Sequence, residues 1–548
     1  MNPMSSKKDE IDALAGFVIQ TGIGGREPHD VESDLRELKV SSILLFKRDL
    51  VGETGRIARK ISAARSLLKQ FQNSDLMEPL FAADQEGGNV ARIEALASPS
   101  AMAYGAAGDI RLTAHSARCV ADYLSKLGIN WNLAPVLDVV MDPNNPIIST
   151  RSFGFDADIV SKHGAAFIKG MNDGGVIACA KHFPGHGRTA TDSHLDLPVI
   201  DVSLNEMLTN DIQPFVAAIR AGVGSIMIGH MNFPSIQGNS EEPASVSREV
   251  VTSLLRERLG YRGLIVTDAL EMHAVSDRYG VGEASVRALQ AGCDMVMTTE
   301  FDQAYEAKNS IIDALSKGNL KISQLRASRQ RILKVMRALR GIREGRTKIR
   351  YLQPSFEVLE MKARAAFQLS AHKSVYSRSF DNPLAPGERI GVVLFDRRRQ
   401  IAADPVSERF SDLIPRSGLK VAFTLRFRDL PEGKDETSQA AMAGKFAVQV
   451  ARMVRDSQCG CAVVRTNESH TSPLQLSFIE HLSRMKVRTV AIGTGSPYEI
   501  KELERRTGGH IEYLCSYCQT PESLTAVFDA LTGVYTPSGG LPVSAGSF

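Results

Sequence analysis

Short apolar runs recur along the first three hundred residues, and longer amphipathic stretches separate them. Runs of this length that are bounded by Gly or Pro are typical of strands buried in a parallel sheet. They are GFVIQ (16–20), SILLF (42–46), PLFAAD (79–84), INWNLAPVLD (129–138), VIACAKH (176–182), GSIMIGH (224–230), GLIVTD (263–268) and DMVMT (294–298). Because helical patterns such as 57–71 and 208–222 lie between the runs, the sequence predicts an α/β fold with a (β/α)8 TIM-type barrel.

A second group of apolar runs follows a charged helical stretch and the proline-containing segment 383–386. These runs are RIGVVLF (389–395), LKVAFTLRF (419–427), CAVVRT (461–466), RTVAIGT (488–494) and IEYLC (511–515). They predict a smaller α/β sandwich domain with a mostly parallel sheet. We therefore expect a barrel domain over 10–345, a linker over 346–385 and a C-terminal α/β sandwich domain over 386–548.

Polar residues stand at the ends of several predicted barrel strands. They are Asp84, Asp138, Lys181 with His182, His230 and Asp268. The carboxyl ends of barrel strands meet on one face, where the following loops build the active site. A helix N-cap would explain an aspartate at such a position, but it would not explain Lys181 or His182. The pattern therefore favours a functional site on this face.

Composition narrows the class of protein. The chain has 548 residues, of which 43% are hydrophobic and 23% charged, with a formal net charge of +3. The length indicates two or three globular domains, and the nearly neutral charge argues against nucleic acid as the main partner. No apolar run reaches the ~18 residues of a membrane span, and no secretory signal is recognisable at the N-terminus. We expect a cytoplasmic protein that does not bind membranes.

Seven cysteines, an odd number, argue against a disulfide framework. The pairs Cys459 with Cys461 and Cys515 with Cys518 match zinc-ligand spacing only loosely. Because Cys461 and Cys515 lie at the ends of apolar runs, buried thiols are the preferred interpretation. We expect no metal and no organic cofactor.

The stretch KHFPGHGRTATDSH (181–194) allows two kinds of chemistry. His182 and His186 have the spacing of helical zinc ligands, but the proline and glycines around them exclude a helix. A loop could still wrap a metal with the help of Asp192 and His194. Alternatively, the Asp192 carboxylate orients the His194 imidazole and raises its basicity for acid/base catalysis. In that interpretation His186 only packs the loop.

A reaction of this kind needs a second group, and VTDALEM (266–272) offers Asp268. This residue follows the apolar run of its strand and should emerge at the mouth of the barrel, where a carboxylate nucleophile belongs. An N-cap of a helix beginning at Ala269 is an equally good interpretation of the local pattern.

Together these motifs resemble glycoside hydrolase family 3, specifically its β-N-acetylglucosaminidase branch. The resemblance includes KHFPGHG and DSH, and it extends to DQEGGNVARI (84–93), RSFG (151–154), VTDALEM and TPSGGLPVS (536–544). The segments keep the family's order and cover both predicted domains. The DSH element is the most specific, because in the β-glucosidase branches a glutamate elsewhere is the acid/base. Asn89 departs from the arginine that is common in the first segment.

The resemblance implies a role for each matching residue. Asp268 would be the nucleophile of a retaining reaction, and His194, oriented by Asp192, would be the general acid/base. The substrate-binding residues would be Asp84, Arg92, Arg151, Lys181 and His182. The implied enzyme is an exo-β-N-acetylglucosaminidase that hydrolyses terminal β-linked GlcNAc, with muropeptide fragments from peptidoglycan recycling as an expected source.

Other interpretations remain at this point. A β-glucosidase or a GlcNAc phosphorylase would use the same fold. A metal-dependent hydrolase would use His182, His186, Asp192 and His194, and a catalytically silent protein would only bind sugar. The expected partner is a small saccharide, and the chain is expected to be a monomer or a homodimer.

Overall fold

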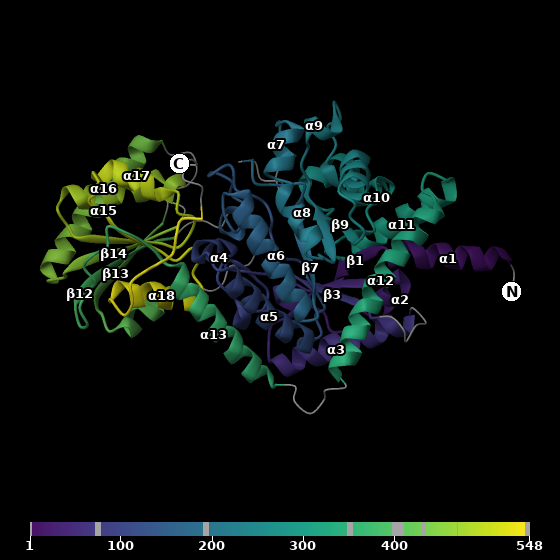
Figure 1. Cartoon of the computed structure of the whole chain (residues 1–548), viewed down its shortest axis with the longest axis horizontal. Helices are drawn as coiled ribbons and strands as arrows, with labels where there is room; N and C mark the ends of the chain where they lie inside the picture. Colours follow the sequence, from purple (N-terminus) through teal and green to yellow (C-terminus); the bar gives the residue numbers. More distant parts are fainter. Residues whose placement is uncertain are drawn as a thin grey trace.

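The computed structural model describes residues 3–71, 78–189, 197–347, 354–396, 410–428, 435–467 and 469–542. Its first part is a closed barrel of parallel strands (Figure 1). The strands are β1 (Ile19–Gly22), β2 (Ser42–Leu44), β3 (Leu80–Ala83), β6 (Trp131–Asn132), β7 (Ile177–Phe183), β8 (Ser225–Ile228), β9 (Leu264–Ala269) and β10 (Met295–Met297). Each predicted run supplies one strand, and β1 pairs with both β2 and β10 to close the ring. The predicted barrel is confirmed.

Amphipathic helices surround the barrel. They include α2 (Glu32–Leu38), α3 (Thr54–Phe71), α5 (Ile110–Leu127), α6 (Ala157–Asp173), α8 (Gln213–Arg220), α10 (His273–Ala291), α11 (Phe301–Lys317) and α12 (Ile322–Thr347). Local sequence sets their ends: Asp109 accepts the backbone N–H of Arg111 at the start of α5, and Gly128 ends it in the left-handed conformation. None of the described helices is both long and apolar enough to cross a membrane.

A small hairpin follows the third barrel strand at the carboxyl end of the barrel. Its strands are β4 (Gln85–Gly87) and β5 (Val90–Ala91). Gly87 has φ +108°, and a Cβ there would lie 2.3 Å from the Ser98 hydroxyl, so only glycine fits. This turn places Glu86 and Arg92 on either side of the hairpin, next to the end of β3.

The second domain is a six-stranded sheet with order β11-β16-β15-β14-β12-β13. Its strands are β11 (Tyr376–Arg378), β12 (Arg389–Asp396), β13 (Lys420–Arg428), β14 (Cys461–Thr466), β15 (Thr489–Gly493) and β16 (Glu512–Cys515). The five predicted runs form the parallel part, and β11 adds an antiparallel edge. Its longer described helices are α15 (Glu436–Asp456), α16 (Pro473–Arg484), α17 (Glu499–Thr507) and α18 (Pro521–Leu531). The predicted mostly parallel α/β domain is confirmed.

The stretch 346–385, which the sequence predicts as a linker, contains a long helix. This helix, α13 (Phe356–Ser374), packs against α5 of the barrel and α18 of the second domain. Figure 1 shows it running from one domain to the other. The division at 346 and 386 stays a prediction, since α13 is shared by both domains.

The two domains also share one hydrophobic core. This inter-domain core joins apolar side chains from α4 (Ala101–Ala107) and the loop after β6 to others from the second sheet and its helices. Members from the barrel are Met102, Ala103, Ala106, Val136, Val140, Ile147, Ile148 and Phe155. Beside it, the imidazole Nε2 of His470 lies 2.9 Å from the carbonyl oxygen of Pro143. The interface is therefore extensive and buried.

A buried carboxylate should stabilise the second domain strongly. Glu499 is 0% exposed and accepts hydrogen bonds from the hydroxyls of Thr466, Ser469 and Tyr513 and from the Ser469 N–H. We expect Glu499→Ala to lower the free energy of unfolding by about 3 kcal/mol, because it leaves these donors unpaired. Chemical unfolding followed by circular dichroism measures the change. The control Glu283→Ala removes only an exposed ion pair with Arg287, and it should cost less than about 1 kcal/mol.

Candidate active site

The predicted binding residues converge at the carboxyl ends of the barrel strands. Asp84 directly follows β3, Lys181 and His182 belong to β7, and Asp268 belongs to β9. Arg151 ends the 3-10 turn η3 (Ser149–Arg151) in the loop after β6. Charged contacts link most of them directly, as the sequence predicts for residues on this face.

A continuous chain of ion pairs organises the site. The Lys181 ammonium lies 2.8 Å from Oδ1 of Asp84 and 2.7 Å from Oε1 of Glu86. Nη2 of Arg92 lies 3.1 Å from Oδ2 of Asp84. At the other end, Arg151 donates to both oxygens of Glu86, each at 2.8 Å. Three cations therefore hold two carboxylates in fixed positions, and the bidentate pair also fixes the plane of the guanidinium. We call Arg92–Asp84–Lys181–Glu86–Arg151 the ion-pair chain.

The ion-pair chain remains charged at neutral pH. Burial works to raise the pKa of Asp84, but Lys181 and Arg92 outweigh it and hold that pKa well below its usual range. Burial likewise opposes ionisation of Glu86, yet Arg151 and Lys181 lower its pKa to about 2. Burial works to lower the pKa of Lys181, and the two carboxylates raise it overall.

The structure adds two residues, Glu86 and Asp138, that the sequence analysis did not assign to the site. Glu86 joins Lys181 to Arg151, and its signal was its place in DQEGG, two residues after Asp84. Asp138, noted only as a strand end, is 0% exposed and contacts His182. Its Oδ2 is 2.8 Å from Nδ1 of His182, and its Oδ1 accepts the His186 N–H at 2.7 Å.

Asp138 sets the tautomer of His182. Burial works to raise the pKa of Asp138, but His182 and His186 lower it overall, so the carboxylate is ionised and can only accept. Nδ1 of His182 must then carry the proton that it donates to Asp138, which leaves Nε2 as the other functional nitrogen of the ring.

Asp268 presents an ionised carboxylate. Its Oδ1 accepts the backbone N–H of Ala269 at 2.8 Å. Burial works to raise its pKa, while His182, His230 and that N–H bring it below its usual value. The alternative role as a helix N-cap is wrong, because α10 begins at His273 and Met272 is its cap residue.

His230 supports the same region. Its Nδ1 lies 2.8 Å from the Ser245 hydroxyl and its Nε2 lies 3.0 Å from the carbonyl oxygen of Ala269. The ring therefore connects the end of β8 to the end of β9, beside Asp268.

Asp192 and His194 lie outside the described residues, so their predicted roles stay predictions. The described part of that loop is buried: His186 is 3% exposed, and burial lowers its pKa to about 4, which keeps it neutral. Arg188 Nε lies 2.9 Å from Asp211 Oδ2, and its Nη1 lies 2.7 Å from Glu206. Within the described ranges no three His, Cys, Asp or Glu residues are placed to hold a metal ion.

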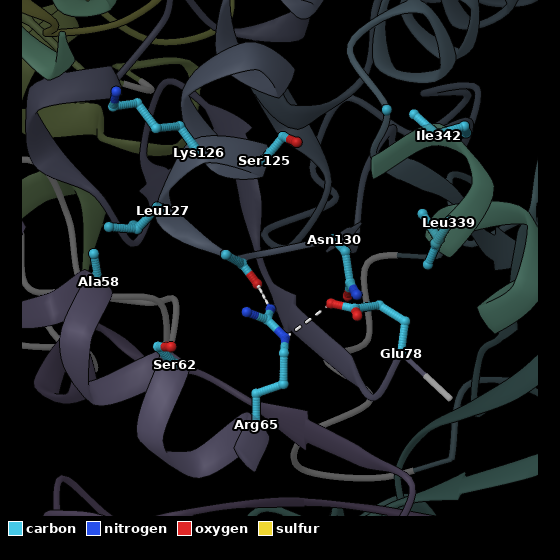
Figure 2. Close-up of a pocket in the computed structure, with 12 residues that line it drawn as sticks. Ala58, Ser62, Arg65, Glu78, Ser125, Lys126, Leu127, Asn130, Leu339 and Ile342 are labelled. Carbon is cyan, nitrogen blue, oxygen red and sulfur yellow. Dashed lines mark hydrogen bonds and ion pairs between the residues drawn. The ribbon is translucent and has the colours of Figure 1, made fainter. Parts of the chain in front are cut away.

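A separate pocket lies at the opposite end of the barrel strands. It is lined by α3, the end of α5, α12 and residues that precede β3, β6 and β7. Figure 2 shows Arg65 and Glu78 in its wall. Nε of Arg65 lies 2.9 Å from Oε1 of Glu78, and Nη2 of Arg65 donates to the carbonyl oxygen of Gly128. This pocket is on the face where barrel enzymes carry stabilising rather than catalytic residues.

Ionisable residues at the carboxyl ends of barrel strands are typical of an enzyme, and comparison with known proteins identifies the family. Residues 9–335 match the model of the glycosyl hydrolase family 3 N terminal domain. The chain therefore belongs to glycosyl hydrolase family 3.

Named relatives agree with this assignment. Beta-hexosaminidase A of Pseudoalteromonas piscicida is 35% identical over 333 residues, which cover 56% of this chain and 55% of that protein. Beta-hexosaminidase LpqI of Mycobacterium tuberculosis is 32% identical over 332 residues, covering 59% and 81%. The chain thus spans about half the length of the first relative and most of the second.

A solved structure matches both domains. It is a glycoside hydrolase family 3 beta-N-acetylglucosaminidase from Paenibacillus sp. str. FPU-7. The TM-score is 0.85 at 28% identity, and the match covers 97% of this chain and 98% of that one. The order and packing of both domains are therefore shared with this protein.

The low pKa of Glu86 predicts a pH dependence of stability. A carboxylate whose pKa falls on folding, here from 4.5 to about 2, stabilises the protein above pH ~4.5 and loses this contribution as the pH falls toward 2. We expect the free energy of unfolding of the wild type to fall more steeply between pH 5 and 2 than that of Glu86→Gln, by about 3 kcal/mol in total. Parallel pH series of urea unfolding would show equal slopes if Glu86 were not ionised in the folded state.

Proposed function

We propose that this protein is a retaining exo-β-N-acetylglucosaminidase that hydrolyses terminal β-linked GlcNAc. The observation that carries the proposal is the position of the Asp268 carboxylate at the mouth of β9, where His182 of β7 and His230 lower its pKa. The names of the relatives and the DSH element of the sequence support the choice of N-acetylglucosamine.

In the proposed reaction Asp268 attacks the anomeric carbon while His194 protonates the departing glycosidic oxygen. Asp192 orients the His194 imidazole and stabilises its charged form. The covalent glycosyl-enzyme is then hydrolysed: His194 takes a proton from water, the water oxygen bonds to the anomeric carbon, and the Asp268 carboxylate leaves. Two inversions give net retention, and the mechanism does not require a cofactor.

The ion-pair chain suits recognition of a neutral sugar. Fixed carboxylates accept hydrogen bonds from hydroxyls, and fixed cations donate to them, so a ring can be oriented without charge on the ligand. Within the ion-pair chain, Asp84, Lys181 and Arg151 would make these hydrogen bonds, and Nε2 of His182 would add one more. Because each group is already held by its ion-pair partner, little conformational entropy is lost on binding.

Finer features of the function also stay proposals. Muropeptide fragments are the proposed natural source of GlcNAc, and the cytoplasm is the proposed location. One relative, from Arthroderma benhamiae, is described as a secreted glycosyl hydrolase. The relatives therefore support the proposed activity more than the proposed location. A monomer or homodimer is the proposed assembly.

Removal of the proposed nucleophile should abolish turnover. We expect Asp268→Asn to lower kcat for an aryl β-GlcNAc by about a thousandfold or more, since no carboxylate remains to form the glycosyl-enzyme. The matched control Asp277→Asn changes an exposed aspartate on α10 and should leave kcat unchanged. A fluorinated GlcNAc analogue should label Asp268 in the wild type, and a label on any other residue would contradict the assignment.

The acid/base role of His194 predicts a dependence on the leaving group. We expect His194→Ala to slow glycosides with poor leaving groups far more than activated aryl glycosides, because an activated group departs with little protonation. Relative kcat/KM over a series of aryl β-GlcNAc substrates measures this. Equal losses across the series would show that another group is the acid.

A further inference from the structure

The loop that carries Arg151 lies between the barrel and the second domain. Ile147 and Ile148 precede the turn η3 and Phe155 follows it, and all three are buried in the inter-domain core. Phe155 also packs on Tyr498 of the second domain, with ring centroids 4.5 Å apart. The position of Arg151 therefore depends on contacts from outside the barrel.

The same loop is tied to the other motif of the site. Asn145 donates to the carbonyl oxygen of His186 at 2.8 Å, and its side-chain oxygen accepts the N–H groups of Ile147 and Ile148. Arg151 donates to the carbonyl oxygen of Ile147 at 3.2 Å. The turn is thus fixed on its barrel side by side-chain hydrogen bonds.

A C-terminal segment, Gly539–Pro542, fixes the turn from the other side. The carbonyl oxygen of Pro542 accepts the Phe155 N–H at 3.0 Å, and Gly540 donates its N–H to the carbonyl oxygen of Ala106 at 2.9 Å. The segment is in turn held by the second domain, where the Tyr517 hydroxyl donates to the carbonyl oxygen of Gly540 at 3.0 Å. These contacts link residues almost four hundred positions apart.

The main chains meet without space for side chains. A Cβ on Gly154 would lie 2.4 Å from the carbonyl oxygen of Pro542, and a Cβ on Gly105 would lie 1.8 Å from that of Phe153. A displacement of the C-terminal segment must therefore be transmitted directly to the backbone next to Arg151.

We propose that the C-terminal segment 539–542 is a positioning element of the active site, which holds the Arg151 turn at the geometry needed for sugar binding. The proposal rests on the proposed function. Arg151 is bidentate to Glu86, and a planar pair of this kind tolerates little shift of the turn. The second domain then takes part in substrate binding without contacting the substrate.

Truncation tests the proposal. A chain that ends at Thr536 lacks the segment but keeps Tyr535, whose hydroxyl binds the second domain; a chain that ends at Val543 is the control. We expect the shorter chain to show a KM for an aryl β-GlcNAc raised by about tenfold, the loss expected for one charge-assisted hydrogen bond. Its kcat should change much less, since binding is lost equally in ground and transition states. A folded shorter chain with an unchanged KM would overturn the proposal, and so would a loss confined to kcat.

If the shorter chain does not fold, the point variants Gly154→Ala and Leu541→Ala test the proposal instead. Gly154→Ala places a methyl group against Pro542, and Gly341→Ala is its control because nothing lies within 4 Å of the added methyl. Leu541→Ala is milder and removes a side chain that packs on the inter-domain core. We expect a raised KM for Gly154→Ala and Leu541→Ala and none for Gly341→Ala. Unchanged KM values for both test variants would overturn the proposal.

A double-mutant cycle identifies Arg151 as the target. In the Arg151→Ala background Leu541→Ala should have no further effect on KM, because the residue it positions is gone. Additive effects would overturn the proposal. If the wild type hydrolysed no aryl β-GlcNAc, the proposed function would fail on its own. The cycle would then be read from the free energies of unfolding, where additivity would overturn the proposal and coupling would support it.

Discussion

The site depends on one buried ammonium group. Lys181 is 3% exposed and lies between the carboxylates of Asp84 and Glu86. A lysine can remain charged at this depth only if its partners are fixed, since an unpaired buried charge is very costly. The β4–β5 hairpin and the loop after β6 must therefore hold their charged residues near β7. Folding of this face and assembly of the candidate site therefore depend on the same contacts.

The barrel was predictable because its strands are apolar on both sides. Strands enclosed by helices form continuous apolar runs, and each of the eight runs became a strand. β11 escaped prediction because Tyr376–Arg378 is a three-residue antiparallel edge without such a run. The helix α13 was hidden for another reason. Its buried residues lie on one face, but Val358, Met361 and Leu369 are apolar residues on its exposed side, so the apolar periodicity that marks a surface helix is weak.

The candidate site was predictable where a charge ended a strand. Asp84, Lys181 and Asp268 follow apolar residues, and an ionisable group at the carboxyl end of a barrel strand needs a reason to be there. Glu86 was missed because it belongs to a tight hairpin, where a glutamate is read as a surface residue. Its contacts with Lys181 and Arg151 show that it belongs to the site. The roles of Asp192 and His194 rest on the sequence, as these residues lie outside the described ranges.

The ion-pair chain also makes the position of each member depend on the others. Arg151 is connected to Asp84 through Glu86 and Lys181. A shift of the turn η3 would therefore move the Glu86 carboxylate, which also pairs with the Lys181 ammonium. The family match ends at residue 335, whereas the backbone beside Arg151 is held by Pro542. A barrel built from residues 9–335 alone would contain every member of the ion-pair chain. It would still lack the hydrogen bond from the Phe155 N–H to the Pro542 carbonyl oxygen, so the described contacts of the candidate site extend into the second domain.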